Sequence, residues 1–124
     1  MPLSFCSLAS GSSGNCQFIE SQTTKLLVDA GMSGKYIKTS LETINVSIYD
    51  INGILLTHEH ADHISGLGVL MRRYKLPLYV TKKTWEVLSD KVGQVDESLL
   101  HVFETIDDIL IGDIRVKGIK ITHD

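Results

Sequence analysis

The segment Ile54–His63 constrains the fold more than any other part of the chain. The apolar run Ile51–Leu56 predicts a strand buried on both faces, and it leads directly into a cluster of metal-binding side chains. Residues two apart in extended chain point the same way, so His58 and His60 can reach one metal ion. Asp62 and His63 follow at once and can reach a neighbouring position. Imidazole and carboxylate suit zinc, manganese or iron, and the lack of thiolates argues against a closed structural zinc site.

Strand and helix patterns alternate around this cluster and predict an α/β fold. The expected strands are Leu3–Leu8, Cys16–Glu20, Lys25–Asp29, Ile51–Leu56, Leu78–Val80, Leu99–Phe103 and Ile109–Ile121, the last broken at Gly112–Asp113 and at Gly118. The expected helices are Ser33–Ile44, Ser65–Tyr74 and Thr81–Val92. Sites in open α/β sheets collect outside the carboxyl ends of strands. Asp29 and the histidine cluster each follow a strand, so the sequence predicts that they share one site.

Composition limits the classes of protein to which the chain can belong. A length of 124 residues fits one ordinary domain, and a formal charge of −3 does not indicate a dedicated nucleic-acid or membrane binder. No apolar run approaches the roughly 20 residues of a membrane span, and the first residues lack the pattern of a signal peptide. We interpret Cys6 and Cys16 as small buried apolar residues, which favours a reducing, cytoplasmic setting.

Two further features have open interpretations. The segment Ser10–Asn15 is either a plain turn or a nest of backbone amides that binds an anion. A basic cluster is either a solvated helix face or a surface for the backbone of nucleic acid; it comprises Arg72, Arg73, Lys75, Lys82 and Lys83. We interpret Trp85 as a core residue and His101 as a core or surface residue rather than a ligand.

Three motifs resemble those of a known family. The pattern His-x-His-x-Asp-His at His58–His63, after an apolar strand, resembles the signature of the metallo-β-lactamase superfamily. Asp29 matches its first motif, an aspartate that braces the histidine loop, and Lys120–Asp124 resembles the third motif, which contains a ligand histidine. The opening Ser7–Cys16 resembles the WalJ/YycJ-like branch, whose members are bacterial cytoplasmic enzymes.

The resemblance implies a four-layer αββα sandwich, of which residues 1–124 would form the N-terminal half of a single domain. The remaining ligands, an aspartate and a histidine, would lie beyond residue 124, with the C-terminal half of the domain absent from this chain. Half of such a sandwich exposes an apolar sheet face, so a homodimer or a domain-swapped oligomer is expected.

The resemblance also implies a site with two divalent metal ions, zinc or manganese. His58, His60 and His123 would hold one metal, and Asp62 and His63 would contribute to the other. Asp62 would also be catalytic by orienting the nucleophile, and Asp29 would support the ligands by hydrogen bonds. The residues expected to bind substrate are Ser12, Ser13 and Asn15.

The function implied is that of a metal-dependent hydrolase that attacks with a metal-bound hydroxide. By analogy with the WalJ/YycJ-like branch, we expect a phosphodiesterase acting on DNA as a 5′–3′ exonuclease. The alternatives are hydrolysis of a small molecule, such as a thioester, lactone or cyclic nucleotide, and a metal-binding fragment without activity. The 124 residues alone are expected to be inactive, because they lack two of the ligands.

Overall fold

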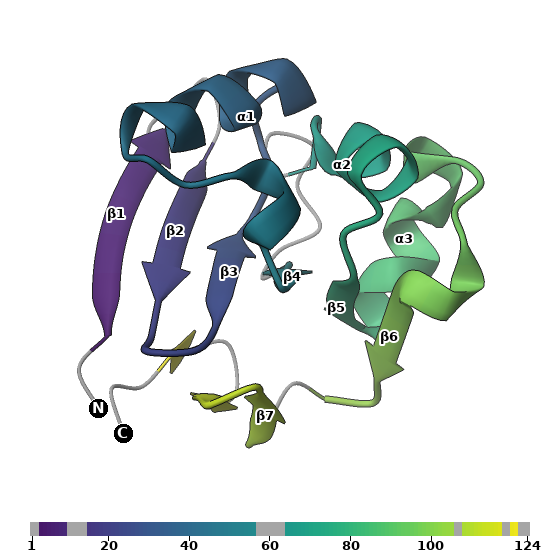
Figure 1. Cartoon of the computed structure of the whole chain (residues 1–124). Helices are drawn as coiled ribbons and strands as arrows, with labels where there is room; N and C mark the ends of the chain where they lie inside the picture. Colours follow the sequence, from purple (N-terminus) through teal and green to yellow (C-terminus); the bar gives the residue numbers. More distant parts are fainter. Residues whose placement is uncertain (1–2, 10–14, 57–63, 106–107, 118–119, 122–124) are drawn as a thin grey trace.

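The fold consists of two β-sheets with helices on one side of the larger sheet (Figure 1). A computed structural model describes residues 3–9, 15–56, 64–105, 108–117 and 120–121. The alternation of strands and helices confirms the predicted α/β class. Within the described part of the chain, no helix is both long enough and apolar enough to cross a membrane.

The larger sheet has six strands that lie side by side in chain order. These strands are β1 (Ser4–Ala9), β2 (Cys16–Glu20), β3 (Lys25–Val28), β4 (Gly53–Leu55), β5 (Leu78–Thr81) and β6 (Leu100–Phe103). The first three pair antiparallel, whereas β3, β4, β5 and β6 pair parallel. Because parallel strands share a direction, the carboxyl ends of β3 to β6 meet at one edge of the sheet.

Helices connect the parallel strands and cover one face of this sheet. Among the described residues, the α-helices are α1 (Gly34–Thr43), α2 (Leu67–Tyr74) and α3 (Lys82–Val92), and short 3-10 helices are η1 (Ile48–Asp50) and η3 (Glu97–Leu99). α1 and α3 begin where the sequence predicts. The hydroxyl of Ser33 accepts a hydrogen bond from the backbone N–H of Tyr36, and that of Thr81 from the N–H of Thr84.

The main core lies between these helices and the sheet. Ile37 and Leu41 of α1, Leu67 and Leu70 of α2, and Leu88 of α3 are fully buried in it. Their spacing of three or four residues places them on one face of each helix. Burying a side chain of this size contributes about 1.5–3 kcal/mol. Trp85 is partly buried against the same core, which confirms its interpretation as a packing residue.

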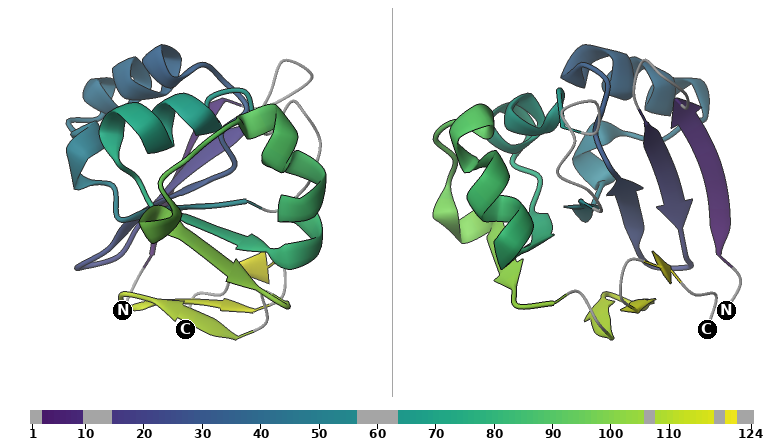
Figure 2. Two further views of the ribbon diagram at one scale, coloured as in Figure 1. Left: turned by 90° about the vertical axis from the view of Figure 1, so that its right-hand side faces the viewer. Right: turned by 180° about the vertical axis from the view of Figure 1, so that it is seen from behind.

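A second, three-stranded sheet covers the opposite face of the larger sheet (Figure 2). Its antiparallel strands are β7 (Ile109–Ile111), β8 (Ile114–Lys117) and β9 (Lys120–Ile121). A second core joins the two sheets; its buried residues are Ile19, Leu26, Val28, Leu55, Ile111, Ile114 and Val116. The described residues therefore form three layers in the order helices, sheet and sheet.

The two sheets are also joined by polar contacts at the turn between β2 and β3. The hydroxyl of Ser21 donates a hydrogen bond to the carboxylate of Asp113, and the backbone N–H of Asp113 donates to the hydroxyl of Thr24 (3.3 Å). Gly112 precedes Asp113 in the left-handed region (φ 59°), and a Cβ atom there would lie 2.0 Å from Oγ1 of Thr24. Position 112, between β7 and β8, therefore requires glycine, because the turn between β2 and β3 lies directly against it.

The strand predicted at Ile51–Leu56 is shorter than expected. It is buried as predicted, but its ladder contains only Gly53–Leu55. The side chain of Asn52 accepts a hydrogen bond from the backbone N–H of Lys25 (2.8 Å), and its own N–H donates to the carbonyl of Lys25 (2.7 Å). A side-chain amide thus replaces one backbone pairing at the start of β4.

Candidate metal centre

Asp29 lies at the carboxyl edge of the larger sheet, between the ends of β3 and β4. Its backbone N–H donates a hydrogen bond to the carbonyl oxygen of Leu55 (2.9 Å). Its backbone is left-handed (φ 64°), a conformation that aspartate adopts more readily than most residues, and this ends β3 at Val28. The side chain is buried, with 7% of its surface exposed. The buried residue is therefore fixed through its backbone at the edge where the sequence predicts a site.

Most of the predicted site residues lie outside the described residues. This applies to His58, His60, Asp62 and His63 in 57–63, to His123 in 122–124, and to Ser12 and Ser13 in 10–14. Asp29 and Asn15 are the two predicted site residues that the structure describes. The assignment of ligands therefore stays a prediction, and the structure bears on it through the residues that flank these segments.

The residues that flank 57–63 are attached to the neighbouring loop and strand. On one side, the N–H of the buried Leu56 donates to the carbonyl of Tyr79 in β5 (3.1 Å). On the other, the N–H of Gly66 donates to the carbonyl of Ala30 (2.9 Å), and the hydroxyl of Ser65 donates to the carbonyl of Gly31. One flank of the histidine motif is thus held to β5, and the other is held to the loop that contains Asp29.

Asn15 joins a third segment to the same edge. Its carbonyl oxygen accepts a hydrogen bond from the N–H of Gly31 (2.8 Å). The residue after the serine-glycine loop therefore contacts the Asp29 loop through its backbone. Whether Ser12, Ser13 and Asn15 bind substrate stays a prediction.

Sequence reasoning misses the roles of Ser65 and Gly66. The sequence predicts a helix that starts at Ser65, but α2 begins at Leu67, and Gly66 precedes it without a side-chain cap. The hydroxyl of Ser65 donates to Gly31 instead of capping the helix. A Cβ atom on Gly66 would lie 2.2 Å from the carbonyl oxygen of Met32, so this position requires glycine. The sequence does contain a signal for these contacts: a glycine directly follows a serine at the start of the helical pattern.

The buried thiol of Cys16 interacts electrostatically with Asp29 and remains protonated near neutral pH. Burial, and then the negative charge of Asp29, raise the pKa of the Cys16 thiol to about 12. A thiol binds a metal as the thiolate, so the raised pKa makes Cys16 a less favourable ligand than an ordinary thiol. This agrees with the interpretation of Cys16 as a small buried residue, whereas Cys6, interpreted in the same way, is only partly buried; both are free cysteines.

The chemistry of the predicted donors fits divalent metal ions. Within the described ranges, no three residues among histidine, cysteine, aspartate and glutamate are grouped closely enough to hold a metal. The predicted donors are the imidazoles of His58, His60, His63 and His123 and the carboxylate of Asp62, and this nitrogen and oxygen set suits zinc and manganese.

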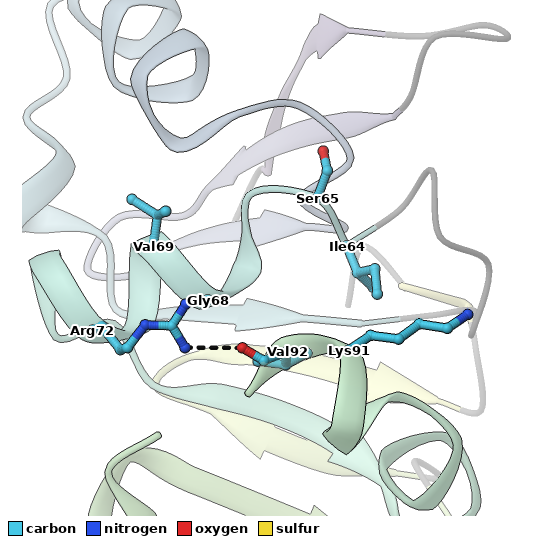
Figure 3. A pocket seen from close by; sticks show the side chains of 7 residues that line it. All are labelled: Ile64, Ser65, Gly68, Val69, Arg72, Lys91 and Val92. Carbon is cyan, nitrogen blue, oxygen red and sulfur yellow. Dashed lines mark hydrogen bonds between the residues drawn. The ribbon is translucent and has the colours of Figure 1, made fainter. Parts of the chain in front are cut away.

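A cavity of about 290 Å³ lies beside the second flank of the histidine motif (Figure 3). It opens between α2 and the end of α3, next to Ile64 and Ser65. The guanidinium of Arg72 lies in its wall and donates hydrogen bonds to the carbonyls of Val92 (2.9 Å) and Gln94 (3.2 Å). Arg72 therefore ties α2 to the end of α3, in addition to belonging to the basic cluster noted in the sequence.

Comparison with known proteins identifies relatives along the whole chain. The model of the metallo-beta-lactamase superfamily matches residues 9–124. The exodeoxyribonuclease YycJ of Bacillus anthracis is 44% identical over 124 residues, which are 100% of this chain and 47% of that protein. The exodeoxyribonuclease WalJ of Streptococcus pneumoniae is 47% identical over 119 residues, which are 94% of this chain and 44% of that protein. The chain therefore spans less than half the length of these relatives.

Solved structures agree with the fold. A B3 metallo-beta-lactamase with an active-site glutamic acid superimposes with a TM-score of 0.71 at 20% sequence identity, over 93% of this chain and 50% of that one. This likeness confirms the predicted metallo-β-lactamase fold, of which the chain covers about half. Proteins of that superfamily generally use two divalent metal ions.

Proposed function

The chain belongs to the metallo-beta-lactamase superfamily, and from this premise we propose that the protein is a metal-dependent phosphodiesterase that shortens DNA from its 5′ end. The observation that carries the proposal is the 44% identity over all 124 residues to a protein named an exodeoxyribonuclease. The B3 β-lactamase, at 20% identity, shares the fold, and fold alone does not define a substrate. The proposed substrate is therefore DNA.

We assign the metal ligands as the sequence motifs indicate. His58, His60 and His123 would hold one divalent ion, and Asp62 and His63 would contribute to the second, with zinc or manganese as the metal. Bound there, the ions would supply Lewis-acid stabilisation of the charge that develops on the phosphate oxygens. Support comes from the attachment of one flank of 57–63 to β5 and of the other flank to the Asp29 loop.

The other side chains of the proposed site would position the attacking water and the histidine loop, or bind the substrate. Asp62 would accept a proton from the attacking water and orient it. Asp29, buried and fixed between β3 and β4, would hold the histidine loop by hydrogen bonds. Ser12, Ser13 and Asn15 would bind a phosphate of the substrate, and the contact between Asn15 and Gly31 supports a place for that loop at the same edge.

We further propose that residues 1–124 form the N-terminal half of one catalytic domain. The matched relatives are about twice as long, and the solved structure is covered to 50%. Leu110 in β7 is 61% exposed, and such an apolar side chain favours association with the second half of the domain or with a second copy. The free cysteines favour a reducing, cytoplasmic setting.

A nuclease assay tests the proposal. The protein translated from its complete reading frame is incubated with manganese or zinc and duplex DNA that carries a 5′ phosphate and a 3′ fluorescent label. We expect stepwise shortening that disappears in His60→Ala. His101→Ala is the matched control, because His101 is exposed, stacks on Tyr79 (ring centroids 4.6 Å apart) and belongs to none of the metal motifs. Intact DNA together with hydrolysis of a thioester or a lactone would contradict the proposal.

A further inference from the structure

A groove between α1 and α2 gathers three positively charged side chains. It is a cavity of about 590 Å³ whose lining residues are Ser33, Gly34, Lys35, Lys38, Val69, Arg73 and Tyr74. Lys35 and Lys38 come from the first two turns of α1, and Arg73 comes from the last turn of α2. Three cations thus line one cavity in a chain whose formal charge is −3.

The positive charge of the groove is largely available to a ligand. Lys35 and Arg73 are both exposed, and among the described residues neither is part of an ion pair with a carboxylate. Lys38 is paired with Glu42 one turn further along α1 (2.9 Å). The guanidinium of Arg73 lies 5.8 Å from the ring centroid of Tyr74, a contact that leaves the donors of the guanidinium edge open.

The groove begins at the edge of the candidate metal centre. Ser33 lies four residues after Asp29 in the chain, and Val69 lies three residues after Gly66, whose N–H donates to Ala30. A Cβ atom on Gly34 would lie 2.7 Å from Cγ1 of Val69, so α1 and α2 are in close contact at this end. From there the groove continues along the helices to Arg73 and Tyr74.

We propose that this groove binds the sugar-phosphate backbone of the DNA strand that the protein degrades. The inference rests on the proposed function. Lysine ammonium groups and the arginine guanidinium bind phosphate without regard to base sequence, and charge complementarity selects this polyanion. The groove would thereby contact a part of the DNA that is remote from the bond that is hydrolysed. None of its residues belongs to the metal motifs.

The test measures binding separately from cleavage. A fluorescent single-stranded DNA is titrated with the protein from its complete reading frame, in EDTA, at several salt concentrations. The groove variant is Lys35→Gln with Arg73→Gln. We expect roughly tenfold weaker binding at low salt, and a slope of log K against log salt that is smaller by about 0.7 for each phosphate that the variant no longer binds.

The matched control removes the same charge elsewhere. It is Lys25→Gln with Arg115→Gln, whose side chains lie on β3 and β8 in ion pairs with Glu20 (3.6 Å) and Asp108 (2.6 Å). Thermal unfolding verifies that both double variants are folded, which the exposure of Lys35 and Arg73 favours. We expect the control to bind like the parent.

The outcomes test the groove independently of the proposed nuclease activity. Parental affinity and salt slope in the groove variant would overturn the inference, and so would an equal loss in the control. A loss confined to the groove variant supports the groove, even in a protein that fails to cleave DNA in the nuclease assay. An active nuclease whose groove variant binds normally contradicts the groove alone.

Discussion

The backbone N–H of Asp29 donates a hydrogen bond to the carbonyl oxygen of Leu55 over 2.9 Å, which fixes the residue after β3 beside the end of β4. The carboxylate of Asp29 is buried there, and its charge contributes to the raised pKa of Cys16. The same loop accepts hydrogen bonds from Ser65 and Gly66 through its carbonyl groups. One short loop thus joins the two segments from which the sequence predicts a shared site.

Replacement of Asp29 by asparagine should weaken metal binding. Asparagine tolerates the left-handed backbone (φ 64°), so the fold should be retained while the negative charge is removed. We expect metal affinity and nuclease activity to fall by about 10–100-fold, the usual cost of losing a group that orients ligands. Titration with zinc, followed by calorimetry, measures the effect. Asp50→Asn, at an exposed aspartate of η1, should bind metal like the parent.

Gly66→Ala should destabilise the protein more than Gly68→Ala. The new Cβ at position 66 would lie 2.2 Å from the backbone oxygen of Met32, which cannot move without the Asp29 loop, and overpacking of this kind costs about 1–3 kcal/mol. At position 68 the nearest atom is Nη2 of Arg72 (2.4 Å), the end of a flexible side chain. Urea denaturation compares the two free energies of unfolding. Equal losses would show that the contact between Gly66 and Met32 is not a constraint.

Cys16 should resist thiol reagents while the protein is folded. With a pKa of about 12, only about one Cys16 in ten thousand is a thiolate at pH 8, and the thiolate is the reactive form. The unfolded thiol has an ordinary pKa and ionises first, so this group should reduce stability as the pH rises from about 9 towards 12. Alkylation with iodoacetamide, read by mass spectrometry, should label Cys16 in urea and spare it without urea. Rapid labelling of the folded protein would contradict the burial of this thiol.

The contact between Ser21 and Asp113 should make stability depend on acid pH. The hydrogen bond from the Ser21 hydroxyl is the main cause that lowers the pKa of Asp113 below its ordinary value. Stability from this contact is fully present above the pKa of the unfolded side chain, about 3.9, and is lost as the pH falls through the lower folded pKa.

Unfolding by urea at pH 7, 5 and 3 tests this dependence. We expect Ser21→Ala to lose stability at pH 7 and to show a smaller further loss between pH 5 and 3 than the parent. Ser40→Ala, at a partly exposed position of α1, is the control and should follow the parent at each pH. A Ser21→Ala profile parallel to that of the parent would exclude the contact as the source of the acid dependence.

The sequence predicts the elements that depend on local patterns. The helix after Ser33 and the helix after Thr81 follow from a capping residue and apolar spacing, and both caps are present in the structure. The helix start predicted at Ser65 is wrong because the acceptor of its hydroxyl, Gly31, lies 34 residues away in the chain. The predicted start of β4 is wrong for the same reason, since Asn52 binds Lys25 across 27 residues. Patterns within a few neighbouring residues cannot predict hydrogen-bond partners that lie so far away in the chain.

The sequence likewise predicts one part of the candidate site and not another. The position of Asp29 at the end of a strand follows from the alternation of apolar residues, and the structure describes it there. The basic cluster of the sequence is divided by the fold: Arg72 binds backbone carbonyls at the end of α3, whereas Arg73 lines a groove with Lys35 and Lys38, which no motif connects with it. The ligand assignments of 57–63 and of His123 stay predictions.

The Ser21–Asp113 contact and Asp29 lie at opposite ends of β3, which has four residues and is therefore about 13 Å long. The polar contacts that join the two sheets at Ser21 and Asp113 are thus remote from Asp29 and the candidate site. A disulfide or an added ion pair at the Ser21 end should therefore raise the melting temperature and leave metal affinity at the candidate site unchanged. Distance along a single strand would then separate a gain in stability from any change at that site.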